Sequence, residues 1–346
     1  MNIFSSARRK NNMNTQRILF TALALSLLAS SVVNAATFKI ASVAPEGTFW
    51  MQEMRTAAED IGKKTQGRVK FKFYPGGVMG SDESVLRKIR IGQLQGGAVT
   101  ASSLTSIAAD IAIYELPYLF DSLEQVDYVR SKMDAELINT LENKGFISFG
   151  LAEGGFSYMM SNEPLQSVAE VRSKKVWLPN NHDVGEAVFT SANVAAVTLP
   201  ISDVLTALQT GLIDTIITSP IGAIALQWHT KIAYVVDEPL TYFSALLVVE
   251  RKAFNKLSEE DRQTVRDIMG QAFIRIDQQN RKDNIEAKDA LKNQGIEFMQ
   301  LSPASKEEWR QIGETAIKQL EKQNKYSDKA YNDLMKYLAE SKQIRP

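Results

Sequence analysis

Apolar and polar residues follow two different periods along this chain. Short segments that are apolar throughout or alternate strictly predict strands, and apolar residues three or four positions apart predict helices. The first third shows five such elements in succession. They are a strand at 38–43, a helix at 49–61, a strand at 69–74, a helix from 81 to about 89 and a strand at 96–102. This order predicts a parallel or mostly parallel sheet with right-handed crossovers.

The rest of the chain continues in the same manner with some longer elements. Strands are predicted at 146–151, 156–161, 176–178, 194–199, 213–218, 233–237 and 245–250. Helices are predicted at 123–143, 184–191, 202–210, around Trp228, and at 258–295, 306–322 and 328–342. Ser202 is expected to cap its helix and Gly211 to end it. Residues 277–284 of the long helix lack an apolar stripe, so we expect that turn to be exposed behind a cleft.

These elements predict an α/β fold of two lobes that are joined by extended crossovers, with one long helix behind them. We expect 36–155 to form the first part of lobe I and 156–245 to form lobe II. Residues 246–346 would then supply a crossover strand, the long spanning helix and the C-terminal helices that complete both lobes. Ligands bind at loops that follow strands in such sheets. A hinged binding protein is therefore the predicted architecture.

The first 35 residues have the pattern of a secretory signal peptide. Four basic residues precede an apolar run of eleven at 18–28, which is broken only by Thr21 and Ser26. After this run, Val33-Asn34-Ala35 resembles a signal-peptidase site. Eleven apolar residues are too few to span a bilayer, so an anchor is the weaker interpretation. We expect cleavage after Ala35 and export to the periplasm, with Met1 or Met13 as the start.

Composition and charge limit the possible partners. Of 346 residues, 44% are hydrophobic and 23% are charged, as in an ordinary soluble protein. Without residues 1–35 the chain carries 36 Lys+Arg against 40 Asp+Glu, and the two signs are interspersed, so nothing predicts a nucleic-acid partner. The absence of cysteine excludes disulfides and an acylated anchor.

The sequence carries no motif for catalysis, a metal or a cofactor. It has two histidines, His182 and His229, no G-x-S-x-G around a serine and no H-E-x-x-H. The glycines at 76, 77 and 80 have neither the lysine of a P-loop nor the spacing of a dinucleotide fingerprint, so they predict a turn between a strand and a helix. We therefore predict a protein that is not an enzyme and needs no cofactor.

Several segments resemble the solute-binding proteins of TRAP transporters, of the DctP type. Residues 74–83 (YPGGVMGSDE) are similar to that family's YPxGxLGxxxE, and 116–120 (LPYLF) to its LPFLF. Residues 207–214 (ALQTGLID) are similar to its ALQTGVVDG, and 164–179 stand where it has P-x(n)-DLKGxKxRxP. The resemblance extends from 38 to about 338. It implies a type II periplasmic binding-protein fold and a receptor that closes on a solute and delivers it to a membrane permease.

The chain departs from this family at the positions that matter for binding. The family's K-x-R-x-P arginine grips the solute carboxylate, but Trp177 stands in its place in Lys175-Val176-Trp177-Leu178-Pro179. A second family arginine falls near Ser157, and Thr215–Thr218 replace acidic and amide residues. Because a buried carboxylate without a cation is costly, these changes favour an apolar or neutral, possibly aromatic, solute. Arg172 and Lys175 are expected on a solvated face.

The predicted binding site combines aromatic walls with a few hydrogen-bonding groups. Trp177 has two interpretations, as a core residue or as a flat side chain at the lip of the cleft, and the motif position favours the cleft. The candidate ligand-binding residues are Trp177, Phe156, Ser157, Tyr158, Trp50, Glu46, Ser102, Asn180, Ser219 and Tyr242. Trp228 is expected in the core of a lobe.

Two alternatives remain open from the sequence. The same receptor could bind an organic acid through non-standard residues, or the chain could be the input domain of a periplasmic sensor. A subset of TRAP receptors is associated with tetratricopeptide proteins and hydrophobic ligands, so such a partner is a further possibility. The solute, the coupling ion and the oligomeric state are not determined by the sequence.

Overall fold

The computed structural model describes residues 35–343. The predicted signal peptide lies outside these residues except for Ala35. Within the described part of the chain, no helix combines the length and the apolar character that crossing a membrane requires.

One mixed sheet runs through the fold. Its strands are β1 (Ala36–Ser42), β2 (Val69–Tyr74), β3 (Gly96–Thr100), β4 (Phe146–Ser161), β5 (Val176–Leu178), β6 (Ala196–Thr198), β7 (Thr215–Thr218), β8 (Tyr234–Val236), β9 (Thr241–Glu250) and β10 (Glu297–Met299). The order is β2-β1-β3-β9-β4-β7-β5-β6, with β8 between β4 and β10. The predicted parallel pairing is confirmed for β1 with β3, whereas β9 is antiparallel to β3 and β4.

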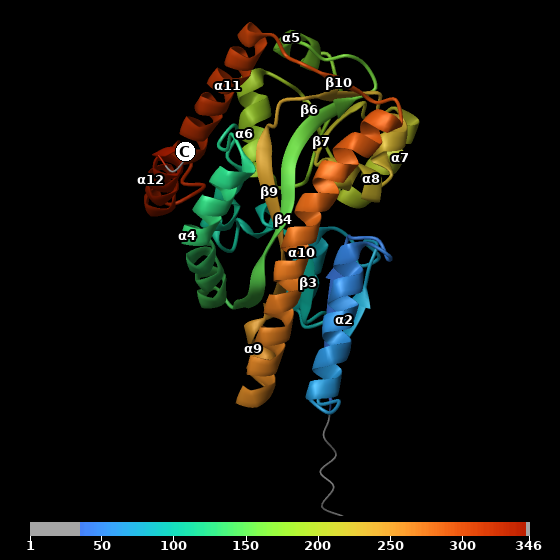
Figure 1. Cartoon of the computed structure of the whole chain (residues 1–346), viewed down its shortest axis with the longest axis vertical. Coiled ribbons are helices and arrows are strands. Elements are labelled where there is room, and N and C mark those ends of the chain that lie inside the picture. Colours follow the sequence, from blue (N-terminus) through green and yellow to red (C-terminus); the bar gives the residue numbers. More distant parts are fainter. Residues whose placement is uncertain (1–34, 344–346) are drawn as a thin grey trace, which may run out of the picture. The chain divides into compact units, whose positions relative to one another are not determined.

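Strands β4 and β9 cross between the two lobes side by side (Figure 1). The prediction of separate strands at 146–151 and 156–161 is wrong, because β4 is one strand of 16 residues. Register shifts against β9 between Ser148 and Leu151 and between Glu153 and Gly155 absorb the irregularity that the glycines introduce. The predicted lobe boundaries, which stay a prediction, fall within these two crossing strands.

The larger helices lie on the faces and the margins of the sheet (Figure 1). They are α2 (Phe49–Lys64), α3 (Asp82–Arg90), α4 (Leu123–Asn143), α6 (Asp183–Ala192), α10 (Glu259–Asn293), α11 (Pro303–Lys322) and α12 (Asp328–Gln343). The shorter helical segments are η1 (Ser102–Leu104), η2 (Ala109–Glu115), α5 (Val168–Val171), η3 (Ile201–Asp203), α7 (Val204–Thr210), α8 (Pro220–Ala225), η4 (Trp228–Lys231) and α9 (Arg251–Phe254).

The long helix α10 is confirmed, with Ser258 as its cap and a buried stripe that includes Val265, Met269 and Phe273. It contacts α2, β4 and α8. The expectation that 277–284 is exposed is wrong. Asn280 donates to the Glu153 carbonyl at 2.8 Å, and Asp277 accepts from the Glu153 N–H at 2.7 Å. This turn lacks apolar residues because it binds the polar backbone of the β4 crossover.

Two smaller predictions need correction. Ser202 does not cap a helix, because the 3-10 turn η3 precedes α7, and the Ser202 hydroxyl donates to Asp203 instead. Gly211 does end α7, in the left-handed conformation. Trp228 begins the 3-10 segment η4 rather than lying on an α-helix.

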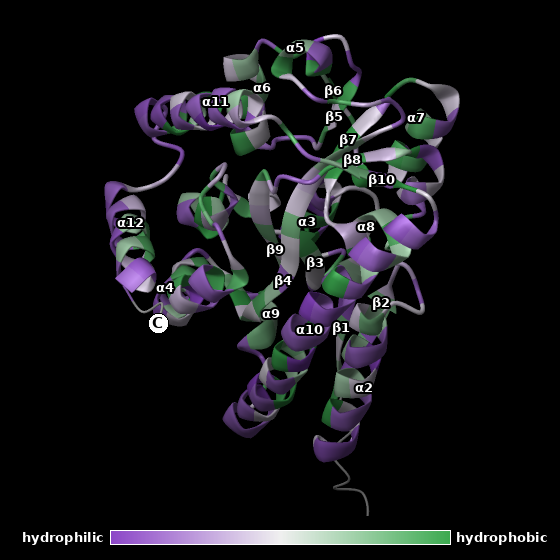
Figure 2. Cartoon of the chain, turned by 45° about the horizontal axis from the view of Figure 1, so that its top comes forward, coloured by the Kyte–Doolittle hydropathy of each residue, from purple (hydrophilic) through white to green (hydrophobic). Residues whose placement is uncertain are grey.

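The hydrophobic core includes two clusters, besides buried residues on α2 and α10 such as Met54 and Met269. One cluster extends from β3 and α4 through β9 to α6 and α11, and it includes Val99, Val129, Leu246, Phe189 and Trp309. A separate cluster in lobe II gathers around Trp177, Trp228, Val204 and Ile216. In Figure 2, green and purple bands alternate along the helices, as expected where one side of each helix is buried. Trp228 is buried in a lobe core, as predicted.

Candidate functional site

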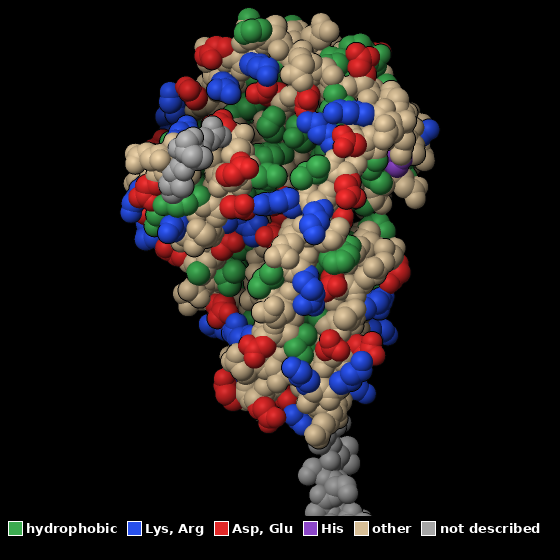
Figure 3. Space-filling view, in the orientation of Figure 1, with side chains coloured by type: hydrophobic (Ala, Val, Ile, Leu, Met, Phe, Trp, Pro, Cys, Tyr) green, Lys and Arg blue, Asp and Glu red, His purple; other side chains and the backbone are tan. Residues whose placement is uncertain are grey.

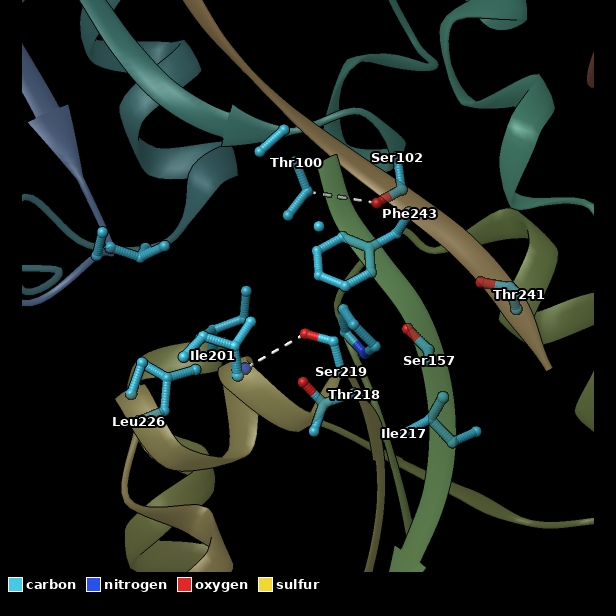
Figure 4. A pocket seen from close by; sticks show the side chains of 18 of the residues that line it. Thr100, Ser102, Ser157, Ile201, Ile217, Thr218, Ser219, Leu226, Thr241 and Phe243 are labelled. Carbon is cyan, nitrogen blue, oxygen red and sulfur yellow. Dashed lines mark hydrogen bonds between the residues drawn. The ribbon is translucent and has the colours of Figure 1, made fainter. Parts of the chain in front are cut away.

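A cavity of about 520 Å³ lies at the strand ends where the two lobes meet along β4 and β9. Residues from β1, β3, β4, β5, β7 and β9 line it, together with the first turns of α2, α6 and α8. Loops and strand ends at such a junction are where α/β folds bind ligands. Figure 4 shows the Phe243 ring and the Ser157 and Ser219 hydroxyls turned into the same space.

An aromatic pair forms one wall. Trp177 on β5 is 4% exposed and Trp228 is 2% exposed, yet both line the cavity. Their rings meet edge to face, with centroids 5.1 Å apart, and the Trp177 Nε1–H donates to the Leu199 carbonyl at 2.9 Å. Trp177 is therefore both a core residue and a cavity residue. The opposite lobe contributes Trp50, whose ring contacts Phe273 edge to face.

Strand alternation decides which of the predicted β9 and β4 residues reach the cavity. Thr241, Phe243 and Ala245 on β9 line it, so Tyr242 between them points to the other face. Tyr242 packs in the core, edge to face with Phe156 at 5.6 Å. The expectation that Tyr242 and Phe156 line the site is therefore wrong.

Tyr158 also lies outside the cavity lining. It shares the Phe156 side of β4, whereas Ser157 between them lines the cavity, as predicted. The Lys288 ammonium lies 5.1 Å from the Tyr158 ring centroid. Burial raises the pKa of Tyr158 to about 12, so this phenol is neutral at physiological pH.

Gly154 and Gly155 shape the crossover beside the cavity. A Cβ on Gly154 would lie 2.2 Å from the Phe243 ring, so only glycine lets this ring pack on the strand. Gly155 has φ +92°, a conformation that side chains rarely adopt, at the register shift of β4. These two glycines therefore place Phe243 and Ser157 in the wall.

Hydroxyl groups supply most of the polar lining. Ser102 and Ser219 lie there, as predicted, but each already has a bond: Ser102 donates to Thr100, and Ser219 accepts from the Gly222 N–H. Among residues 35–343, the hydroxyls of Ser157, Thr218 and Thr241 make no hydrogen bond. They remain available to a solute.

The charged lining is acidic. Among the described residues that line the cavity there is no lysine or arginine; Glu115, Glu153 and Asp283 are there, with His182. Glu153 is 2% exposed and accepts from Arg281 Nη2 at 2.6 Å and from the Tyr242 hydroxyl at 3.3 Å. Its charge is thus balanced by a partner outside the cavity.

Glu115, the last residue of η2, is in a different situation. It is 1% exposed, and neither carboxylate oxygen has a hydrogen bond within the described chain. His182 Nε2 lies 3.3 Å from Oε2, and His182 Nδ1 accepts from the Gly185 N–H at 2.9 Å. Burial lowers the pKa of His182, but Glu115 raises it more, so the net shift is upward.

Two predicted residues lie elsewhere. Glu46 is exposed and pairs with Arg55, whose Nε is 2.7 Å from Oε1. Asn180 lines a neighbouring space of about 250 Å³ beside α3, which shares Thr100, Ser102 and Ile201 with the main cavity. Arg172 and Lys175 are exposed, as predicted.

Sequence reasoning missed Glu115, His182, Glu153, Thr218, Thr241 and Phe243. Only the β9 residues had a usable signal, since the alternation of Thr241, Phe243 and Ala245 with buried Tyr242 and Ser244 follows one face. Glu115 and His182 are 67 positions apart, and the fold brings the end of η2 and the N-cap of α6 together. The described residues contain no group of three or more side chains that could hold a metal.

A cavity at a two-lobe junction, lined mostly by apolar residues, is typical of a solute-binding protein. The family model of bacterial extracellular solute-binding proteins, family 7 (DctP), matches residues 40–324. The chain belongs to this family of periplasmic receptors, which are not enzymes. The resemblance to TRAP solute-binding proteins is confirmed.

Relatives with known structures share the fold. The Bordetella pertussis receptor DctP7, in complex with pyroglutamic acid, superposes with a TM-score of 0.80 at 21% identity and covers 88% of this chain and 100% of that one. The sugar acid-binding protein DctPAm of Advenella mimigardefordensis, in complex with galactonate, gives 0.81 at 18% identity, with 89% and 99% covered. The uncharacterized protein YiiZ of Salmonella typhimurium is 21% identical over 60% of this chain and 64% of its own length.

Proposed function

We propose that this protein is the periplasmic receptor of a TRAP-type secondary transporter and that its solute is apolar or neutral, with an aromatic molecule as the best fit. The observation that carries this proposal is the absence of lysine and arginine from the described cavity lining. A carboxylate that leaves water without a cationic partner loses several kcal/mol, on the order of 2–7 for polar groups in general.

The walls support the same solute class. The two tryptophans, Phe243 and the aliphatic residues around them make the lining mostly apolar, and the three free hydroxyls provide orientation. The relatives described above bind pyroglutamic acid and galactonate, which both carry a carboxyl group. This chain has Trp177 where the resemblance places the carboxylate-binding arginine, so we propose that its solute differs from theirs.

The transport role includes a partner in the membrane. After closing on its solute, the receptor would deliver it to TRAP-type permease subunits. Figure 3 shows a face on which acidic and basic side chains are mixed, and such a surface suits docking through many small complementary contacts. A periplasmic tetratricopeptide protein is a second possible partner, for which the apolar cavity is the supporting feature.

The solute can be identified directly. The mature protein, purified without denaturation, should release an uncharged, mostly apolar molecule on extraction, and mass spectrometry should show one molecule bound per chain. Recovery of an organic acid would contradict the solute class and support the alternative in which His182, the one basic side chain in the described lining, meets the acid.

Trp177→Arg tests the wall itself. The arginine would place a charge in an apolar cavity, so we expect loss of the native solute. Trp177→Phe keeps an aromatic surface and should retain the solute with weaker binding, which covers the case in which the arginine variant does not fold. Lys175→Arg, two residues away and exposed, is the matched control. Unchanged binding in Trp177→Arg would remove Trp177 from the site.

A further inference from the structure

We propose that Glu115 is the polar recognition point of the cavity and binds an O–H or N–H donor on the solute's otherwise apolar body. This inference rests on the proposed function and adds to it the chemical group that orients the solute. The feature that requires an explanation is a carboxylate that is 1% exposed, lines the cavity and has no hydrogen bond to either oxygen within the described residues.

A buried carboxylate without a hydrogen bond lowers the stability of the folded protein. A buried polar atom without a partner loses the hydrogen bonds that water would give it, and a buried charge loses more. Nearly all buried polar groups therefore have partners, and exceptions are found where a ligand or an ion supplies the missing one. Glu115 is among the residues that line the cavity, so a solute bound there would lie beside this carboxylate.

His182 does not fill this role. Its Nδ1 accepts the Gly185 N–H at 2.9 Å, so a neutral imidazole carries its proton on Nε2. Nε2 lies 3.3 Å from Glu115 Oε2, but no aligned hydrogen bond joins them, and Oε1 has no neighbour of this kind. The histidine therefore keeps the carboxylate in place and leaves lone pairs on it for a solute.

The rest of the lining selects the same kind of group. Glu153 and Asp283 add negative charge, and no lysine or arginine lines the described cavity to attract an acid. A donor head group is thus favoured over an acceptor, and a hydroxyl or a neutral N–H group supplies that donor on an uncharged solute. The aromatic pair at Trp177 and Trp228 would hold the apolar part of the solute.

Four probes with one benzene ring separate these properties: ethylbenzene, 2-phenylethanol, phenethylamine and 3-phenylpropionate. Calorimetric titration of the mature protein should show that the alcohol and the amine bind about tenfold or more tightly than ethylbenzene, since a hydrogen bond to a charged group has that effect. Glu115→Leu should remove the difference. Glu115→Gln should retain part of the alcohol's advantage and lose the amine's, and it also serves if the leucine variant does not fold.

Glu46→Gln, at an exposed glutamate outside the cavity, is the matched control and should bind all four probes as the unchanged protein does. Equal binding of ethylbenzene, the alcohol and the amine, unaffected by Glu115→Leu, would overturn the role of Glu115 and leave the proposed solute class intact. Tightest binding of 3-phenylpropionate, or binding of none of the four, would overturn the solute class itself.

Discussion

Two glutamates line the same cavity and are buried to the same degree, yet their surroundings differ completely. Glu153 on β4 accepts hydrogen bonds from Arg281 and Tyr242, whereas Glu115 at the end of η2 accepts none within the described chain. A carboxylate whose charge is balanced inside the protein stabilises the fold. One that accepts no aligned hydrogen bond, with only His182 Nε2 at 3.3 Å beside one oxygen, keeps acceptor capacity for a donor on a solute. The comparison separates a structural group from a binding group.

The arginines near the cavity bind groups within the protein and stabilise the fold. Arg130 on α4 bonds to Asp277 on α10 at 2.9 Å, to the Leu151 carbonyl on β4 at 2.8 Å and to the Tyr242 hydroxyl on β9 at 3.1 Å. Burial raises the pKa of Tyr242, so this phenol keeps its proton and can donate to Glu153. The network joins four elements at the crossover, and neither Arg130 nor Arg281 lines the cavity.

Arg130→Met should have the largest effect on stability. It leaves Asp277 and three further acceptors, among them Asp134, without this donor in a buried site, and breaking such a pair costs about 3–5 kcal/mol. Urea denaturation would measure the free energy of unfolding. Arg251→Met removes an exposed arginine and should change it by less than about 0.5 kcal/mol. A cost for Arg130→Met as small as that of the control would show that the network is not structural.

Glu153→Gln should come next, with a cost of about 2–3 kcal/mol, because Arg281 loses a buried charge partner. Arg281 keeps Asp127, at 2.7 Å, so the loss is smaller than for Arg130. The same denaturation experiment applies. A stabilised Glu153→Gln protein would mean that this carboxylate, too, is held in place for a solute.

Glu115→Gln should act in the opposite direction in the solute-free protein. The amide replaces a buried charge that has no hydrogen bond, so stability should be unchanged or higher by about 1 kcal/mol. Thermal unfolding of the two glutamine variants side by side gives the sharpest form of the comparison. Equal destabilisation of both would place Glu115 with Glu153 among the structural groups.

The smallest expected effect is a pH dependence of the free energy of unfolding that comes from His182 beside Glu115. Since Glu115 raises the pKa of His182 in the folded protein, the resulting stability is fully present below the unfolded value of about 6.5 and is lost as pH rises through the folded value. When His182 is protonated, its Nδ1 can no longer accept the hydrogen bond from the Gly185 N–H, and this loss limits the gain in stability. Between about pH 5 and pH 8, His182→Gln should remove this dependence. A flat difference between the variant and the unchanged protein would contradict it.

The predictions from sequence were reliable wherever a local pattern was sufficient. The helices 49–61, 123–143 and 258–295 were found within two or three residues because their apolar stripes are long and their caps are clear. They failed where partners come from elsewhere in the chain. The polar turn at 277–284 was expected in solvent because its partners, Arg130 and the β4 backbone, are more than 100 positions away.

The candidate site shows the same division. Trp50, Ser102, Ser157, Trp177 and Ser219 line the cavity as expected. Phe156, Tyr158 and Tyr242 do not, because successive residues of a strand point to opposite faces and these three lie on the face away from the cavity. Glu46 and Asn180 lie on loops whose positions depend on packing with α2 and α3.

The sequence by itself determined the longer elements and the family, because local periodicity and short motifs encode them. Only the tertiary structure decided that Glu153 accepts hydrogen bonds from the chain and that Glu115 accepts none within the described residues. That difference depends on groups far apart in the chain, Arg281 beside Glu153 and His182 beside Glu115, and a hydrogen bond depends on distance and angle in space.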